Sequence, residues 1–255
     1  MSSSKYMMVE RKHLRLITRR LFSELRKRRL LDSSTRQKIL DRSNVLSPFG
    51  WIVYRLASMG LWETVYEIIK IRPGEIVIHK NGVDDDLFEH PHVKLYHEYI
   101  FSVWEPDQCD ILVLLPCTNV KPYRRSPIHR AMLSYAKRIS KRGVKIEIYA
   151  ISEPMLIVPL KYDNLYPVAN YDFPPKDMKK HERKKFVDLL AKILPKIVAK
   201  QKKIVAFMPR HHSGILMDAI KKANCKLEIE FWPYGRLAFK SAYTLYKHIL
   251  GILSS

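Results

Sequence analysis

Five reactive side chains lie in one short stretch of the chain, residues 116–129, directly after the apolar run 111–115. They are Cys117, Lys121, Tyr123, Ser126 and His129. In an open α/β sheet, ligands bind beyond the carboxyl ends of the strands. A strand at 111–115 would therefore place these side chains in a crevice that suits chemistry.

Cys117 is the candidate nucleophile of this stretch. Positive neighbours such as Lys121 and His129, and the amides of a helix start, lower the pKa of a thiol and favour the thiolate. The alternative is that Cys117 is a small buried residue at a strand end, the commonest fate of a cysteine. His129, on the first or second turn of the next helix, is either an acid–base group or a hydrogen-bonded structural residue.

Three further segments follow predicted strands and should meet the first at one edge of the sheet: 152–174, 209–214 and 233–236. They add imidazoles, cations and tyrosines around one crevice, which suits a base or a nucleotide. From the second of these segments we expect Arg210, His211 and His212 to contact the substrate, together with Asn119 from the first loop.

Strand and helix patterns alternate through the second half of the chain. Strands are predicted at 111–115, 144–151, 204–208 and 227–232, and helices at 127–142, 180–200, 214–224 and 238–250. This alternation predicts an α/β fold, a three-layer sandwich with a four-stranded, mainly parallel sheet between two helical layers.

The first part of the chain has a different pattern. Apolar residues at helical spacing among many basic ones predict an amphipathic helix at 9–29, followed by helices that begin near 32 and 47 and a fourth at 62–71. A short strand is predicted at 75–79 before the turn Asn81-Gly82. We therefore divide the chain into a basic, mainly helical region at 1–88 and an α/β domain at 89–255.

The chain is strongly basic, with 46 Lys and Arg against 25 Asp and Glu and a formal charge of +21. The simplest partner for such a charge is a polyanion, and nucleic acid is the first choice. A basic surface that only keeps the protein soluble is the alternative. The Lys-rich helices at 11–29 and 179–203 are predicted to contact phosphates, or else to be solvated faces.

Several other classes of site are disfavoured. The sequence has neither a GxGxxG turn nor a GxxxxGK[ST] loop, so classical dinucleotide and nucleoside triphosphate sites are not expected. Cys109, Cys117 and Cys225 form no CxxC pair, and we expect reduced thiols, no metal and no cofactor. Without a membrane-spanning run or a signal-peptide core at its start, the protein is expected in the cytoplasm.

The fourteen residues 116–129 contain the full pattern PC-x3-KPY-x2-S-x2-H. This pattern resembles the signature of the archaeosine synthase family, archaeal enzymes that modify a deazaguanine base in the D-loop of tRNA. The segment 153–174 resembles the second block of that family, to which it contributes Tyr171 and Asp172. The resemblance covers about residues 90–235.

The resemblance implies a uracil-DNA-glycosylase-like fold and the addition of lysine to the nitrile of 7-cyano-7-deazaguanine in tRNA. A radical S-adenosylmethionine partner protein then cleaves the adduct. The implied catalytic residues are Cys117, Lys121, His129 and Asp172, and the implied substrate contacts include Tyr123, Ser126 and Tyr171.

We hypothesise that the Cys117 thiolate attacks the nitrile to give a thioimidate, which the lysine amine displaces as an amidine. His129 would move protons, and Asp172 would hold the incoming lysine ammonium.

The chain also departs from the family pattern. Glu153 stands before Pro154 where serine is usual, and lysines follow the second block. Family members resemble a fusion with flanking domains, so we expect a short or split variant that lacks the RNA-binding PUA domain. Two other functions stay open: a non-catalytic nucleic-acid-binding subunit of a modification complex, and a uracil-DNA-glycosylase-like repair protein acting on DNA.

Overall fold

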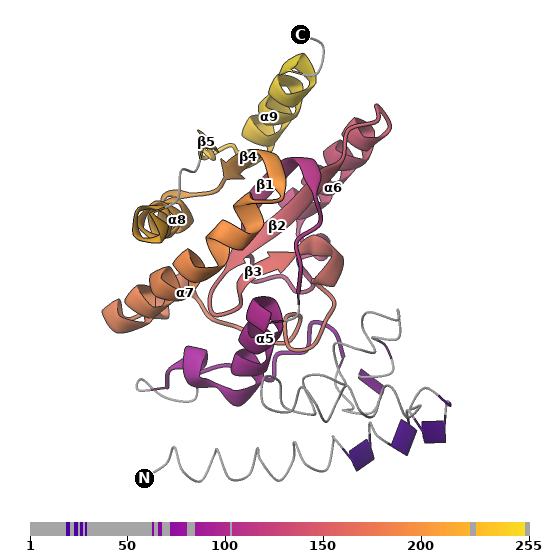
Figure 1. Ribbon diagram of the computed structural model, residues 1–255, viewed down its shortest axis with the longest axis vertical. Helices are drawn as coiled ribbons and strands as arrows, with labels where there is room; N and C mark the ends of the chain where they lie inside the picture. Colours follow the sequence, from indigo (N-terminus) through magenta and orange to yellow (C-terminus); the bar gives the residue numbers. More distant parts are fainter. Residues whose placement is uncertain are drawn as a thin grey trace.

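A computed structural model of the chain describes residues 72–80, 85–102, 104–224 and 228–252, with scattered positions between 19 and 67 (Figure 1). The helices predicted at 9–29, near 32 and 47, and at 62–71 lie almost wholly outside the described residues. The sheet and the loops at its carboxyl edge are described throughout, apart from a gap before the last strand.

The sheet has five strands in the order β3-β2-β1-β4-β5. They are β1 (Cys109–Pro116), β2 (Ile146–Ser152), β3 (Leu156–Pro159), β4 (Gln201–Phe207) and β5 (Ile229–Trp232). Four of them run parallel, and β3 pairs antiparallel with β2 at one edge. The prediction of a four-stranded sheet was therefore wrong by one strand. The missing one has four buried residues, too few to show a period of two.

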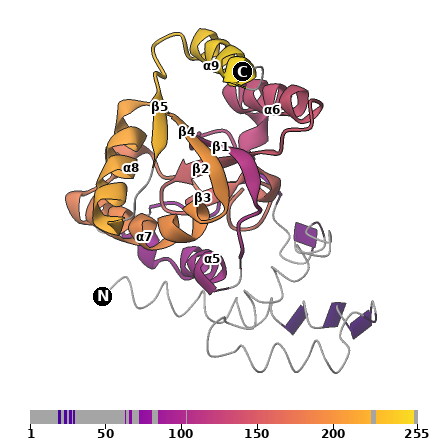
Figure 2. The same ribbon diagram turned by 45° about the horizontal axis from the view of Figure 1, so that its top comes forward.

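Helices cover both faces of the sheet (Figures 1 and 2). They are α5 (Pro91–Ser102), α6 (Pro127–Ser140), α7 (Lys180–Val198), α8 (Arg210–Ala223) and α9 (Ala238–Ile252). The neighbours α6 and α9 lie on one face, and α7 and α8 on the other. This arrangement confirms the predicted α/β class with helices on both faces; the uracil-DNA-glycosylase-like fold stays a prediction.

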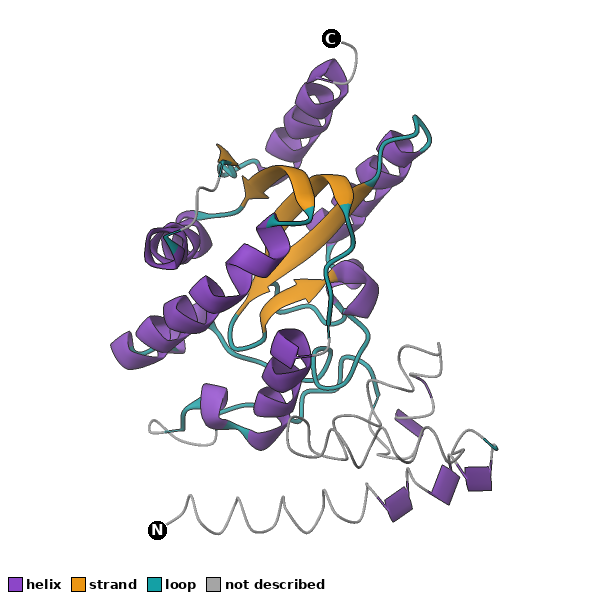
Figure 3. Ribbon diagram, in the orientation of Figure 1, coloured by secondary structure: helices purple, strands orange, loops and turns teal. Residues whose placement is uncertain are grey.

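Helix α5 was not predicted, because its apolar residues are interrupted by histidines. It covers the edge of the sheet at β3 (Figure 3). The Tyr96 hydroxyl donates to the carbonyl of Ile157 at 2.8 Å, and His97 Nε2 lies 2.7 Å from the carbonyl of Pro154. The helix therefore holds the turn between β2 and β3 in place.

The centre of the core is β1, whose residues 112–115 are at most 1% exposed. A parallel strand in the middle of a sheet is covered on both faces, so its sequence is a continuous apolar run rather than an alternating one. The run Leu-Val-Leu-Leu has this character, and it was the easiest element to predict.

The segment 72–80 packs beside the loop that carries Tyr171. The amides of Gly74 and Ile78 donate to the carbonyls of Ala169 and Asn170, at 2.9 and 3.0 Å. The strand predicted at 75–79 is reduced to one bridge, between Ile78 and Tyr171. A domain boundary at residue 88 stays a prediction, although this segment already contacts the α/β domain.

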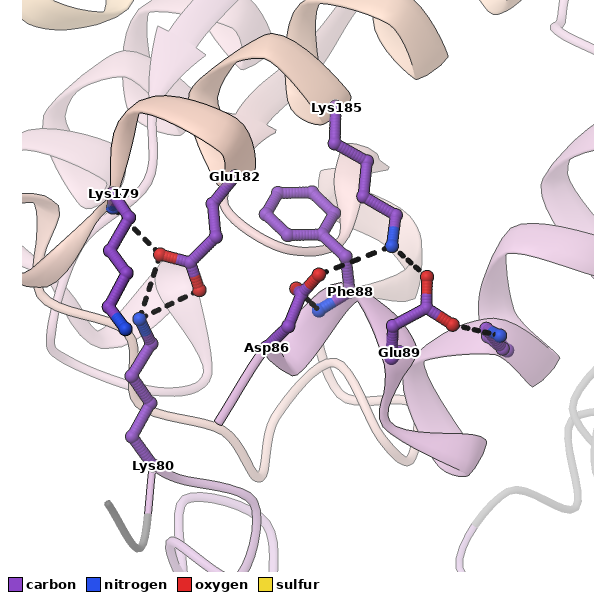
Figure 4. A network of polar contacts seen from close by, with 8 residues as sticks. Lys80, Asp86, Phe88, Glu89, Lys179, Glu182 and Lys185 are labelled. Atoms are coloured by element: carbon purple, nitrogen blue, oxygen red, sulfur yellow. Dashed lines mark hydrogen bonds and ion pairs between the residues drawn. The ribbon is translucent and has the colours of Figure 1, made fainter. Parts of the chain in front are cut away.

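Ion pairs tie the same region to the start of α7 (Figure 4). Lys80 Nζ lies 2.7 and 2.8 Å from the two carboxylate oxygens of the fully buried Glu182. Lys185 pairs with both Asp86 and Glu89. The amino-terminal half of α7 is thus fixed by charges from the chain that precedes the sheet.

Across the part of the chain that the structure describes, no helix is both long and apolar enough to cross a bilayer.

Candidate active site

The site forms where β1, β2 and β4 end. Cys117 follows β1, Glu153 follows β2, and His211 and His212 lie on the first turn of α8, which follows β4. The Cys117 thiol donates to Glu153 Oε2 at 3.3 Å, and Sγ lies 3.5 Å from His212 Nε2. Parallel topology thus brings together residues far apart in the sequence, as expected for strand ends.

Glu153 is the centre of this cluster and is fully buried. His211 Nε2 donates to Oε1 at 2.9 Å, and His212 Nε2 lies 3.3 Å from Oε2. Burial alone would raise the pKa of Glu153, but the bonds from His211 and His212 outweigh it and hold the pKa well below its usual range. Glu153 is therefore a carboxylate at neutral pH.

The thiol of Cys117 has the opposite character to the one expected from the sequence. Burial raises its pKa well above the ordinary value, the Glu153 carboxylate raises it further, and Lys121 only partly opposes them. The prediction of a lowered thiol pKa was wrong, because it counted the nearby cation and missed the carboxylate. In this state Cys117 is a thiol whose proton points at Glu153.

A second cluster of buried hydroxyl groups lies beside the first. Tyr123 OH is 2.8 Å from Ser152 Oγ, and both groups also hydrogen-bond to Tyr171 OH. The two tyrosines have exposed fractions of 1% or less, and burial raises their pKa values. The structure thus places Tyr123 and Tyr171 together, as expected, and adds Ser152.

Lys121 joins the two clusters. Its Nζ lies 4.4 Å from the ring centroid of Tyr171 and 5.0 Å from that of Tyr123. Burial lowers the pKa of Lys121, and the nearby acidic groups of Cys117, Asp172 and Glu153 oppose this shift. The ammonium is the positive charge of the pocket, placed between aromatic faces and acidic groups.

His129 and Ser126 lie behind Tyr123. The imidazole of His129 is fully buried and stacks on Tyr123, with ring centroids 5.7 Å apart, and its Nδ1 is 3.4 Å from Ser126 Oγ. Burial lowers the pKa of His129 to about 4. His129 is thus a neutral ring that supports Tyr123, and the imidazole next to the thiol belongs to His212.

Three predicted site residues stand apart from these clusters. Asn119 and Arg210 are exposed, and the side chain of neither makes a hydrogen bond, an ion pair or a ring contact with another described residue. Asp172 is half-buried, and its amide donates to the carbonyl of Ile78 at 2.9 Å. Its charge is near enough to Lys121 to raise the pKa of that ammonium.

The position of Glu153 in this cluster was not predicted from the sequence, where this residue counted only as a departure from a family pattern. A signal was present, because a carboxylate directly after a predicted strand lies at the same edge as Cys117. Among the described residues, Cys117, Glu153 and His212 are the only group of three or more His, Cys, Asp or Glu donors close enough to hold a metal ion.

Fold and site together define a class of protein: an α/β domain with a thiol, a carboxylate and imidazoles at the carboxyl edge of its parallel strands. The sequence profile of the domain of unknown function DUF5591 matches residues 93–237, more than half of the chain. The protein belongs to this family, and the matched region contains every predicted site residue. The resemblance to the archaeosine synthase family is confirmed.

Two curated relatives support this assignment. The archaeosine synthase subunit alpha of Thermoplasma acidophilum is 25% identical over 146 residues, which cover 57% of this chain and 27% of the relative. The archaeosine synthase of Methanocaldococcus jannaschii is 26% identical over 186 residues, 71% of this chain and 29% of the relative. The chain thus spans less than a third of the length of either relative.

A crystal structure of AF0587, a protein of unknown function, has a TM-score of 0.44 and 22% sequence identity. The match covers 60% of this chain and 49% of that one.

Proposed function

We propose that this protein acts in archaeosine formation and adds the side-chain amine of lysine to the nitrile of 7-cyano-7-deazaguanine in tRNA. The names of the two relatives support the pathway, and the complete signature at 116–129 supports the reaction. The observation that carries the proposal is the Cys117 thiol, 3.3 Å from a buried carboxylate at the strand edge.

The proposed reaction has two steps. First, the sulfur of Cys117 bonds to the nitrile carbon and its proton passes to Glu153. One π bond of the nitrile becomes a lone pair on nitrogen, and Glu153 passes the same proton on to that nitrogen, which gives a thioimidate. The lysine amine then attacks the same carbon, the carbon–sulfur bond breaks, and the proton released by the amine returns to the thiolate. The product is an amidine.

The other residues have positioning roles in this proposal. Lys121, Tyr123 and Tyr171 line the pocket for the base. Asp172 holds the ammonium of the incoming lysine, which releases one proton to solvent before it attacks as the amine. Proton transfer, which the sequence analysis gave to His129, goes to Glu153 because this carboxylate contacts the thiol. Asn119 and Arg210 are free to contact the nucleotides that flank the modified base.

The substrate also requires a surface for tRNA, and α6 and α9 supply the best one. They pack together through Tyr135 and Tyr246, whose rings stack with centroids 4.7 Å apart. Neither helix contains a single Asp or Glu. On α6, Arg130, Lys137 and Arg138 are exposed and have no ion pair with another described residue.

Helix α9 adds aromatic faces to this surface. The exposed fractions of Phe239 and Tyr243 are 56% and 47%, and Lys240 and Lys247 are exposed beside them. Exposed aromatic rings among cations suit RNA, because the cations contact phosphates and the rings stack on unpaired bases.

Helix α7, which was expected to contact phosphates, is less suited to bind tRNA than α6 and α9. Several of its cations are already neutralised: Lys185 by Asp86 and Glu89, Arg183 by Asp218, and Lys196 by Glu105. The basic helix predicted at 9–29 lies almost entirely outside the described residues.

Salt dependence separates the two surfaces. Replacing Arg130, Lys137 and Arg138 by Gln should lower the slope of log affinity against log salt by about 2 to 3, at about 0.7 to 0.9 for each lost phosphate contact. Replacing the exposed Lys184 and Lys192 of α7 is the control and should change it little. A larger loss in the α7 variant would contradict this assignment.

Lysine transfer tests the reaction itself. Purified protein is incubated with labelled lysine and tRNA that contains the cyano base, and mass spectrometry of the nucleosides detects the amidine. We expect Cys117→Ala to abolish the product and Cys109→Ala, at the other end of β1, to retain it. Full activity of Cys117→Ala would refute the covalent route. tRNA that is bound but unchanged would favour a non-catalytic binding subunit.

The resemblance further implies a radical S-adenosylmethionine partner protein that cleaves the lysine adduct. This partner stays a prediction, which co-purification from native extract would test.

A further inference from the structure

The atoms Cys117 Sγ, Glu153 Oε2 and His212 Nε2 form a nearly equilateral triangle. The three edges are 3.3 Å (Sγ to Oε2), 3.3 Å (Nε2 to Oε2) and 3.5 Å (Sγ to Nε2). Zinc binds these atoms at about 2.3 Å for sulfur, 2.0 to 2.1 Å for nitrogen and 2.0 to 2.2 Å for oxygen. A tetrahedron with such bonds has edges of about 3.3 to 3.7 Å, so the triangle has the size of one face of a zinc site.

The distances fit a metal site better than a set of simple hydrogen bonds. A charge-assisted bond between nitrogen and a carboxylate is about 2.7 to 2.9 Å long. The distance from His211 Nε2 to Glu153 Oε1 is 2.9 Å and falls in this range. The distance from His212 Nε2 to Glu153 Oε2 is 3.3 Å and is longer. The carboxylate thus makes one ordinary hydrogen bond with His211 and holds its other oxygen toward the triangle.

Burial and charge fit the same conclusion. Glu153 is fully buried and His212 is 4% exposed, while Cys117 is only partly buried and keeps one side open. A carboxylate and a thiolate together carry two negative charges, which a divalent cation balances.

We propose that Cys117, Glu153 and His212 bind Zn²⁺, with a fourth position open to solvent and His211 orienting the carboxylate from outside. No metal was expected from the sequence, because its cysteines and histidines do not have the short spacing of a metal-binding motif. Here the three ligands follow three different strands, β1, β2 and β4. A mixed set of one sulfur, one nitrogen and one oxygen donor with an open position is suited to zinc.

Zinc binding and thioimidate formation use the same sulfur and exclude each other. Resting on the proposed function, this predicts that micromolar zinc inhibits lysine transfer reversibly and that a chelator restores it. The metal site itself stands on geometry and is tested without any reaction.

The test is a titration of the full chain with Co²⁺, which replaces zinc and reports a bound thiolate by a charge-transfer band in the near ultraviolet. We expect the band at one equivalent, with displacement by Zn²⁺. Cys117→Ser should abolish the band and His212→Gln should weaken binding more than a hundredfold. His211→Asn should weaken binding about 10- to 100-fold, as losses outside the ligand shell do.

Cys109→Ser is the matched control, because Cys109 is the other described cysteine and should leave the titration unchanged. A band that persists in Cys117→Ser, or no band in the parent protein while circular dichroism shows it folded, would overturn the proposal. Either result would leave the lysine-transfer assay, and therefore the proposed function, untouched.

Discussion

Two buried histidines predict how the stability of the protein depends on pH. Burial lowers the pKa of both His97 and His129 from 6.5 to about 4. The folded protein therefore holds both rings neutral, whereas the unfolded chain protonates them as the pH falls below 6.5. Their contribution to stability is fully present above pH 6.5 and is lost as the pH falls toward 4.

The size of the effect follows from these two pKa values. For each ring, the free energy of unfolding should fall by about 2 kcal/mol between about pH 7 and about pH 5. The pair therefore accounts for about 4 kcal/mol, a large part of the stability of an ordinary domain. Carboxylates with ordinary pKa values contribute little in this interval, so histidines dominate it.

Urea unfolding of the parent protein and of His97→Gln and His129→Gln at the two pH values measures this effect. Each variant is expected to be less stable at neutral pH but to lose about 2 kcal/mol less on acidification. His181→Gln, on an exposed part of α7, controls for the loss of one imidazole. Variants of His97 and His129 that keep the full pH dependence of the parent would refute the reasoning.

Three further predictions concern the pocket and its supports. Alkylation of Cys117 by iodoacetamide, with a chelator present, should accelerate up to and beyond pH 9, because burial and Glu153 raise the thiol pKa; a plateau below neutral pH would contradict this. Gly74→Ala should cost more stability in thermal unfolding than Gly143→Ala, because both glycines have a positive φ but only a side chain at Gly74 meets a backbone atom, the Lys121 carbonyl oxygen at 2.7 Å. The strain alone is about 1 to 3 kcal/mol, and equal losses would show that the loop moves aside. Glu182→Gln should lower the free energy of unfolding, measured in urea, by about 3 kcal/mol, since it removes one partner of a buried ion pair with Lys80. A loss below about 1 kcal/mol is typical of an exposed ion pair and would contradict this prediction.

Elements with a strong local signal could be predicted from the sequence. The buried run of β1 and the helix α6, which begins at Pro127 after Ser126 and is followed by Gly143, were predicted within a few residues of their bounds. Strand β3 could not be found because four apolar residues have no periodicity that separates them from a loop.

Residues of the candidate site could be predicted from the sequence, but the electrostatic environment of the thiol could not. Strand ends predicted that Cys117 and His212 would lie at one edge, and the structure places them 3.5 Å apart. The sequence could not show that a buried carboxylate would lie 3.3 Å from the thiol, and burial together with this carboxylate reverses the expected direction of the thiol pKa. Charges near in sequence are a poor guide when the fold brings Glu153 in from another strand.

Capture of the covalent intermediate tests the central claim most directly. The protein is incubated with tRNA that contains the cyano base and without lysine, and intact-mass and peptide spectra then locate any adduct. The proposed reaction predicts a thioimidate on Cys117 that disappears when lysine is added and never forms in Cys117→Ala. Lysine transfer that proceeds at full rate in Cys117→Ala, with no adduct in the parent protein, would contradict it.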